Sequence, residues 1–308
     1  MASDAPVGTT VGTTREGVSR LRNMVSNDRI GSSGFVALAH ATLARLGDRG
    51  VDLRHARRLH RCDEILRQVH KGELRIARDD PKTLDLIARA VCDIREFYLI
   101  SRTLPKRRDA ETDGKLRVVL RGSAKAKNFQ FELLLGALFA VAGIPVRPDP
   151  PDLRFLFGEE EWGIAAKRVT SDEQLAKRTT RAVGQLKEQR IRGIVAVNVD
   201  AFVRGLDVSE GMDGRWDEFD RRVARLHNLY PALAEQVSLV GIVAMGQVVE
   251  WALDRPTPHL QYPWLFRSQG FNGNTTVDRI LLQLQAQMES RTADIQREID
   301  LIVGPRIP

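Results

Sequence analysis

Four polar side chains, Glu132, Asp152, Lys167 and Gln185, lie within a largely apolar stretch that runs from Phe131 to Asp200. A carboxylate can ligate a divalent metal ion, and a neighbouring ammonium group can orient a water molecule and offset developing negative charge. Lys167 ends an apolar run, and a buried lysine is rare unless it is paired or functional. The elements that connect these residues decide whether the four groups can meet.

Two short hydrophobic runs within residues 153–169 predict a β-hairpin. If Phe157 pairs with Trp162, Asp152 falls directly opposite Lys167, and the two side chains share one face of the hairpin. A register shift of one residue would place them on opposite faces. The three consecutive glutamates between the runs are expected to form a solvated turn. The simplest alternative for Asp152 and Lys167 is a structural ion pair across the strands.

Helical patterns flank the hairpin on both sides. Residues 131–143 predict a helix with Glu132 in its first turns, where the helix dipole favours a carboxylate. Residues 171–190 predict a second helix that carries Gln185 on the stripe facing a sheet. Residues 194–199 are almost wholly apolar, as in a central strand covered on both faces. An ordinary N-terminal glutamate and a solvent-facing glutamine remain the alternatives for the two polar residues.

The order helix, strand, hairpin, helix, strand resembles the PD-(D/E)xK nuclease superfamily, which has the restriction-endonuclease-like fold. The resemblance covers residues 128–200, about a quarter of the chain. The residues that match the family pattern are Glu132, Pro151-Asp152, Lys167 and, on the following helix, Gln185 or Gln189. The resemblance implies an α/β fold with a mixed α+β sheet and an αβββαβ core, preceded here by a helical domain.

The resemblance also implies a chemistry, namely metal-dependent hydrolysis of DNA by an endonuclease. Asp152 and Glu132 would hold Mg²⁺ or Mn²⁺, and Lys167 would position the attacking water. Gln185 would orient a nearby group. Many nucleases of this fold act as dimers, so a homodimer is the expectation at the level of the family.

One position departs from the family pattern, because Ala165 stands where the family has an acidic residue two places before the lysine. Three explanations are open: a nuclease whose acidic residue has moved, a degenerate nuclease that binds without cutting, or a deliberate replacement of the ligand by alanine. The alternative function is therefore a catalytically silent nuclease fold that binds DNA or a protein partner. In a third hypothesis, the chain is a helical interaction protein whose central unit is only structural.

The remaining sequence suggests three parts. Residues 1–16 read as a flexible tail, residues 17–115 as a helical domain, and residues 116–308 as the nuclease-like domain. The helical domain is expected to include residues 18–25 as helix, and the LRVVL run directly after its end (residues 116–120) is expected to be a short strand. A basic stripe on one predicted helix, made of Arg54, Arg57, Arg58 and Arg61, is interpreted as a solvated face.

The last third is expected to mix helices near residues 216–227 and 231–236 with a strand at 239–243. The VVEWAL run is expected to continue the sheet. Residues 254–274 are rich in proline and glycine and predict a loop, and a final helix is expected to begin at Thr275 or Thr276.

The composition places the chain among globular proteins without a membrane segment. The net charge is +7 and the pI about 9.7, which is compatible with a polyanion partner. No apolar run of membrane-spanning length and no signal peptide is visible. Only two cysteines occur, Cys62 and Cys92, and we interpret them as buried reduced thiols of a cytoplasmic protein.

Overall fold

The computed structural model describes residues 10–13, 19–25, 32–74, 80–105, 108–123, 125–200, 239–247, 250–252, 259–261, 264–270, 279–280 and 283. The helices within these ranges are α1 (Ser32–Asp48), the short 3₁₀ helix η1 (Leu53–His55), α2 (Arg57–Lys71), α3 (Pro81–Thr103), α4 (Ala110–Arg121), α5 (Ala126–Val141) and α6 (Asp172–Glu188). The strands are β1 (Thr10–Thr13), β2 (Ser19–Val25), β3 (Val146–Asp149), β4 (Asp152–Phe157), β5 (Glu160–Arg168), β6 (Gly193–Asn198), β7 (Leu239–Gln247), β8 (Glu250–Ala252), β9 (His259–Gln261) and β10 (Trp264–Gly270).

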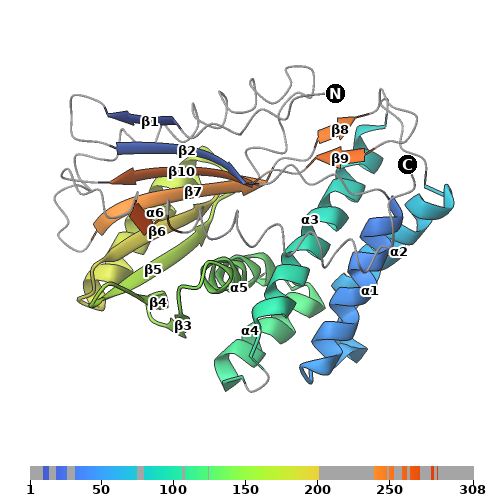
Figure 1. Ribbon diagram of the computed structural model, residues 1–308, viewed down its shortest axis with the longest axis horizontal. Coiled ribbons are helices and arrows are strands. Elements are labelled where there is room, and N and C mark those ends of the chain that lie inside the picture. Colours follow the sequence, from blue (N-terminus) through green and yellow to red (C-terminus); the bar gives the residue numbers. More distant parts are fainter. Residues whose placement is uncertain are drawn as a thin grey trace.

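One mixed sheet of eight strands organises the molecule, in the order β1-β2-β10-β7-β6-β5-β4-β3 (Figure 1). The central strands β5, β6 and β7 are parallel. The strands on both sides of them pair antiparallel. The protein is therefore a mixed α/β structure, as the sequence predicts at that level.

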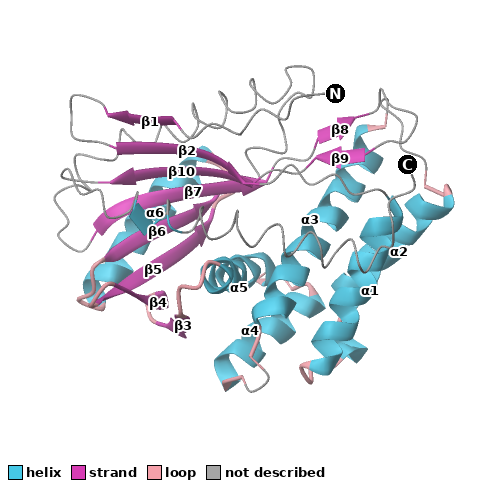
Figure 2. Ribbon diagram, viewed as in Figure 1, coloured by secondary structure: helices cyan, strands magenta, loops and turns pink. Residues whose placement is uncertain are grey.

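Helices α5 and α6 cover opposite faces of the sheet (Figure 2). Ile164 of β5 belongs to the same buried cluster as Leu134 of α5. The next residue toward the turn, Gly163, lies against α6, because a Cβ added there would come within 3.0 Å of Leu186 Cδ2. Successive side chains of a strand point to opposite faces, so residues 163, 165 and 167 share the α6 face.

The first four helices lie beyond α5 and continue its core. In Figure 1 they occupy the right-hand side, while the sheet occupies the left. A single cluster of buried side chains runs from Leu38 of α1 through Phe97 of α3 and Leu134 of α5 to Met245 of β7. The domain boundary expected between residues 115 and 116 falls inside α4.

The N-terminal predictions for residues 10–13 and 18–25 are wrong. Residues 19–25, expected as helix, form β2, and residues 10–13 of the expected tail form β1. The spacing of the apolar residues in the segment SRLRNMV fits both a helix and a strand. The segment forms a strand because it pairs with β10. That partner lies more than 230 residues later in the sequence.

The LRVVL run, expected as a strand, is part of helix α4. The residues that cap the two ends of this helix outweigh the preference of Val118 and Val119 for a strand. Asp109 caps the start by accepting a hydrogen bond from the N–H of Thr112, and Gly122 ends the helix with φ 80°.

Two predictions in the last third are also corrected. VVEWAL does not continue the main sheet, because β8 pairs with β9 in a separate two-stranded sheet. The expected loop at 254–274 contains β9 and β10. The strand predicted at 239–243 is confirmed by β7. The helices expected at 216–227 and 231–236 lie outside the described residues, as does nearly all of the expected last helix.

Candidate functional site

Asp152 and Lys167 are in direct contact. Lys167 Nζ lies 2.8 Å from Asp152 Oδ2 and also donates to the carbonyl of Ala166 at 2.9 Å. The same Oδ2 accepts a hydrogen bond from the backbone N–H of Ala166 at 2.8 Å. The side chains of Lys167 and Asp152 are 11% and 15% exposed, so the pair is largely shielded from water.

The pair forms in a different register from the predicted one. Phe155, rather than Phe157, is the partner of Trp162. The turn between Phe157 and Glu160 is shorter than expected, and Gly158 adopts φ 66° in it. The register therefore shifts by two residues, which leaves every side chain on its predicted face.

Continuing the observed register by one pair places Asp152 opposite Ala165 and diagonal to Lys167. Strand β4 starts at Asp152, and the last Cα pair of β4 and β5 at this end is Leu153 with Ile164. The Asp152 carboxylate then accepts the next backbone donor of β5, the N–H of Ala166. The Asp152 side chain thus continues the hydrogen bonding between β4 and β5 by one more bond, and it also binds Lys167.

Glu132 approaches this pair from α5. It is 8% exposed, and its Oε2 lies 2.9 Å from Nζ of Lys115 on α4. The pKa of Glu132 is raised, mainly because the side chain is buried, and the nearby charge of Asp152 raises it further. The hydrogen bond from Lys115 and the charge of Lys167 act in the opposite direction. Glu132 therefore lies within electrostatic reach of both hairpin residues, although its direct partner is Lys115.

Gln185 lies behind the hairpin without touching the pair. Among the described residues its Oε1 is buried and has no hydrogen-bond partner. Its neighbour Leu186 packs over Gly163, and a Cβ at Gly163 would also come within 3.1 Å of Pro151 Cδ. No described contact joins Gln185 to Asp152 or Lys167, and its buried Oε1 is an acceptor without a partner among the described residues.

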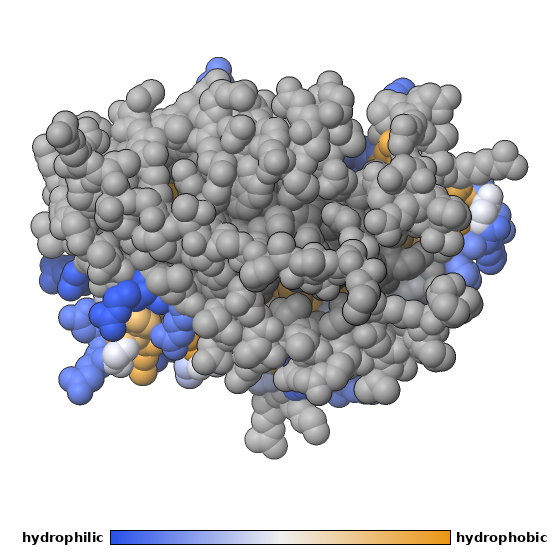
Figure 3. Space-filling view, turned by 45° about the horizontal axis from the view of Figure 1, so that its top comes forward, coloured by the Kyte–Doolittle hydropathy of each residue, from blue (hydrophilic) through white to orange (hydrophobic). Residues whose placement is uncertain are grey.

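The alternative glutamine, Gln189, belongs to the other end of the hairpin, where its Oε1 accepts a 3.4 Å hydrogen bond from Arg154. The turn there is not simply solvated, because Glu161 pairs with Arg147 at 2.6 Å and with Arg154 at 3.0 Å. Figure 3 shows hydrophilic residues gathered at the lower left, in the part of the molecule that carries this turn and α6. These charges bind one another and stay apart from Lys167.

The residues present fit a Mg²⁺ or Mn²⁺ ion only in part, because Glu132 comes from α5, on the sheet face opposite to the one that carries Lys167, and is paired with Lys115. Within the described ranges no three acidic, histidine or cysteine side chains come together as a metal site. Asp152 accepts both of these hydrogen bonds on Oδ2, and among the described residues no hydrogen bond reaches its Oδ1. Mg²⁺ is commonly held by one or two carboxylates with waters and phosphate oxygens completing the shell. Asp152 supplies one, and Glu132, which is paired with Lys115, lies within electrostatic reach of it.

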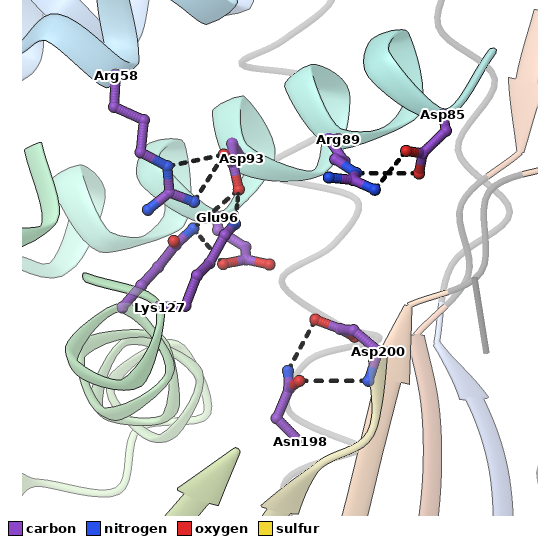
Figure 4. Close-up of polar contacts among 9 residues, drawn as sticks. Arg58, Asp85, Arg89, Asp93, Glu96, Lys127, Asn198 and Asp200 are labelled. Carbon is purple, nitrogen blue, oxygen red and sulfur yellow. Dashed lines mark hydrogen bonds and ion pairs between the residues drawn. The ribbon is translucent and has the colours of Figure 1, made fainter. Parts of the chain in front are cut away.

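A buried polar cluster between α2, α3 and α5 has no counterpart in the sequence prediction (Figure 4). Asp93 accepts from Arg58 at 2.6 Å and from Lys127. Gln130 donates to Glu96. Arg58 is therefore not part of a solvated stripe, since its side chain is only 13% exposed. The available signal was the presence of polar residues three apart, Asp93 with Glu96 and Lys127 with Gln130, on strongly apolar helices.

The two carboxyls of this cluster titrate in opposite directions. Burial alone would raise the pKa of Asp93, but Lys127 and Arg58 outweigh it and lower that pKa to about 2. Burial raises the pKa of Glu96 to about 7, and the negative charges of Asp200 and Asp93 oppose the attraction of Lys127. Burial therefore favours the neutral form of Glu96.

Asp200 and Asn198 end strand β6 and were also missed. Asn198 Nδ2 donates to Asp200 Oδ2 at 2.9 Å, and the Asp200 N–H donates back to Asn198 Oδ1 at 3.3 Å. Both residues are 3% exposed. Polar residues at the carboxyl end of a central parallel strand often line a binding crevice, and this placement was the available signal.

Comparisons of the chain with models of protein families, with curated proteins and with solved structures gave no match. Among the helices that the structure describes, none is both long enough and apolar enough to cross a membrane. Cys62 and Cys92 are buried free thiols, as the sequence predicts.

Proposed function

We propose that the protein is a metal-dependent phosphodiesterase that acts on DNA, built on a restriction-endonuclease-like core. The observation that carries the proposal is the contact of Lys167 Nζ with Asp152 Oδ2 at 2.8 Å, at the open end of the hairpin. The order of elements from α5 to β6 supports it. So does the basic balance of the chain, with a net charge of +7.

Each residue would have a separate role in the hydrolysis of the phosphodiester. Asp152, through its open Oδ1, and Glu132 would hold Mg²⁺ or Mn²⁺, which when bound supplies Lewis-acid polarisation of the phosphodiester. Lys167 would orient the attacking water and offset the negative charge that develops on the phosphate. Gln185 would use its free Oε1 to accept a hydrogen bond from that water or from the substrate.

Ala165 favours the second candidate, a nuclease fold that binds DNA or a protein without cutting. The residue lies in register with Asp152, and it is fully buried on the face covered by α6. A glutamate at this position would have to displace packed atoms before its carboxylate could reach a metal. The site therefore has at most two carboxylates in place, and its metal affinity is expected to be low.

The test is cleavage of supercoiled plasmid and of single-stranded DNA at increasing Mg²⁺ or Mn²⁺ concentrations. The wild-type protein, Asp152→Asn and Ala165→Glu would be compared, with Glu161→Gln as a control on the same hairpin. The proposal expects metal-dependent cleavage that Asp152→Asn abolishes and Glu161→Gln keeps. Failure of both the wild type and Ala165→Glu to cleave either DNA would reject it. Anisotropy of a labelled duplex with the same proteins would then test DNA binding alone.

A further inference from the structure

A second cavity lies between the α1–α2 connection and helix α4, and none of its lining residues belongs to the candidate site. Its volume is about 480 Å³. Cavities that take small ligands span roughly 300–1,000 Å³. The apolar cavity beside Glu132, at about 160 Å³, is smaller than this range. The larger cavity has room for a molecule of nucleotide size.

The cavity carries positive charge that the protein does not neutralise. Its two lining carboxylates are occupied, because Asp113 pairs with Arg108 and Asp52 pairs with Arg54 at 2.8 Å. Within the described residues, neither Arg117 nor Arg121 forms an ion pair. Arg117 uses only Nε, in a long 3.3 Å hydrogen bond to the carbonyl of Asp113. Two guanidinium groups are thus available for an anion.

The spacing on α4 places these charges beside an apolar floor. Arg117 and Arg121 are four residues apart, so they lie one turn apart on the same side of the helix. Leu116 and Leu120 follow the adjacent row, line the same cavity and are each 2% exposed. Because the leucines are almost fully buried, a ligand that suits this lining is recognised chiefly through an anionic group at the arginines.

The walls of the cavity are held in place by contacts within the protein. Arg108 is 8% exposed and donates to the carbonyl of Arg49 as well as to Asp113, and so ties α4 to the end of α1. Gly50 turns the chain with φ 73°, and the N–H of Val51 donates to the Leu46 carbonyl at 3.0 Å. The site is therefore preformed, which reduces the entropic cost of binding.

We propose that this cavity binds a phosphorylated small molecule of nucleotide size, with its phosphates on Arg117 and Arg121. Guanidinium groups bind phosphate oxygens through paired, charge-assisted hydrogen bonds, and they keep their charge at all physiological pH values. His55, which also lines the cavity, can donate a further hydrogen bond to the phosphate.

The test is isothermal titration of the full chain with adenosine 5′-diphosphate, with adenosine and inorganic pyrophosphate as the two part-ligands. The proposal expects the diphosphate to bind more tightly than either part. Arg117→Gln and Arg121→Gln should each weaken it about 10-fold or more, since a hydrogen bond to a charged group is lost. Arg57→Gln, an exposed arginine of α2 outside the cavity, is the matched control and should bind normally.

Three outcomes would overturn the proposal. The first is no binding of the diphosphate at millimolar concentration by a protein whose melting curve shows it folded. The second is equal binding by the cavity variants and the Arg57→Gln control. The third is tighter binding of a short DNA duplex that depends on Arg117 and Arg121, which would make the surface a contact for nucleic acid. None of these readouts uses cleavage, so the result is independent of the proposed nuclease activity.

Discussion

The Asp152–Lys167 pair and the Asp93 cluster both place carboxylates inside the protein, but they differ in how completely those carboxylates are bonded. Both oxygens of Asp93 are taken, Oδ2 by Arg58 and Oδ1 by Lys127. Among the described residues, Asp152 accepts two hydrogen bonds, both on Oδ2. A saturated carboxylate supports structure, whereas one with an open oxygen can still bind a metal or a water. The comparison therefore supports a structural role for the first group and agrees with the proposed chemical role of the second.

The largest effect is expected from Asp93→Ala. The substitution leaves the part-buried cations Arg58 and Lys127 without their partner, and breaking a buried pair in this way costs about 3–5 kcal/mol. The free energy of unfolding, measured by urea denaturation at neutral pH, should fall by that order. Because the pKa of Asp93 is lowered to about 2 from 3.8, its contribution is present above about pH 4 and is lost as the pH falls through 2. A stability loss below about 1 kcal/mol would contradict a structural role.

Lys167→Gln should separate chemistry from stability. The amide can still donate to Asp152, but the charge that stabilises the reacting phosphate is lost, and such losses are on the order of 10²–10³-fold in rate. Cleavage rates should fall accordingly, while unfolding free energy changes by no more than about 2 kcal/mol. Arg147→Gln, on the neighbouring strand β3, where Arg147 pairs with Glu161 near the turn of the hairpin, is the control that should retain full activity. Equal rates for Lys167→Gln and wild type would remove Lys167 from the proposed site.

Glu96→Gln tests the buried cluster through pH. The pKa of Glu96 is about 7 in the folded protein against 4.5 when unfolded. The folded protein therefore binds the extra proton between these values, and stability falls as the pH rises through them. The variant keeps an acceptor for Gln130 and carries no charge. It should match the wild type near pH 4 and exceed it by about 1–3 kcal/mol at pH 8, as measured by thermal or urea unfolding. A constant difference at all pH values would refute the assignment.

The smallest effect is expected from Lys115→Gln. The hydrogen bond from Lys115 lowers the pKa of Glu132, whose burial raises it. Removing the ammonium group should raise that pKa further, so that Glu132 becomes ionised, and able to hold a metal, only at higher pH. The acid limb of the pH–rate profile should move toward higher pH, with little change in the rate on the alkaline side. An unchanged acid limb would mean that Glu132 does not take part.

The sequence predicted the hairpin contact because the side chains of a strand alternate between two faces, so that a register error of two residues keeps each side chain on its face. An error of two residues in register left Asp152 and Lys167 on one face, and the diagonal reach of lysine completed the pair. The same local reasoning placed Glu132 on a helix beside the sheet. It could not find Lys115 as the partner of Glu132, because the sequence around Lys115 predicts a basic connector with a short strand at residues 116–120 in place of helix α4.

Features that depend on distant partners could not be predicted in this way. Strand β2 is defined by β10, and the cluster around Asp93 gathers residues from three helices. The sequence of a helix does not reveal whether one of its arginines faces water or a buried aspartate, as Arg58 shows. Local patterns specify the type of an element, whereas the identity of the atoms facing it is set by how the elements pack.

The N–H of Ala166 has a consequence for experiments on the hairpin. This amide is held by the Asp152 side chain rather than by another strand, so its protection from solvent depends on where that carboxylate points. A metal or ligand that draws Asp152 away would release the amide, and its deuterium uptake would accelerate while the amides of neighbouring strand residues stayed protected. A single backbone proton thus reports occupancy of the site, independently of turnover.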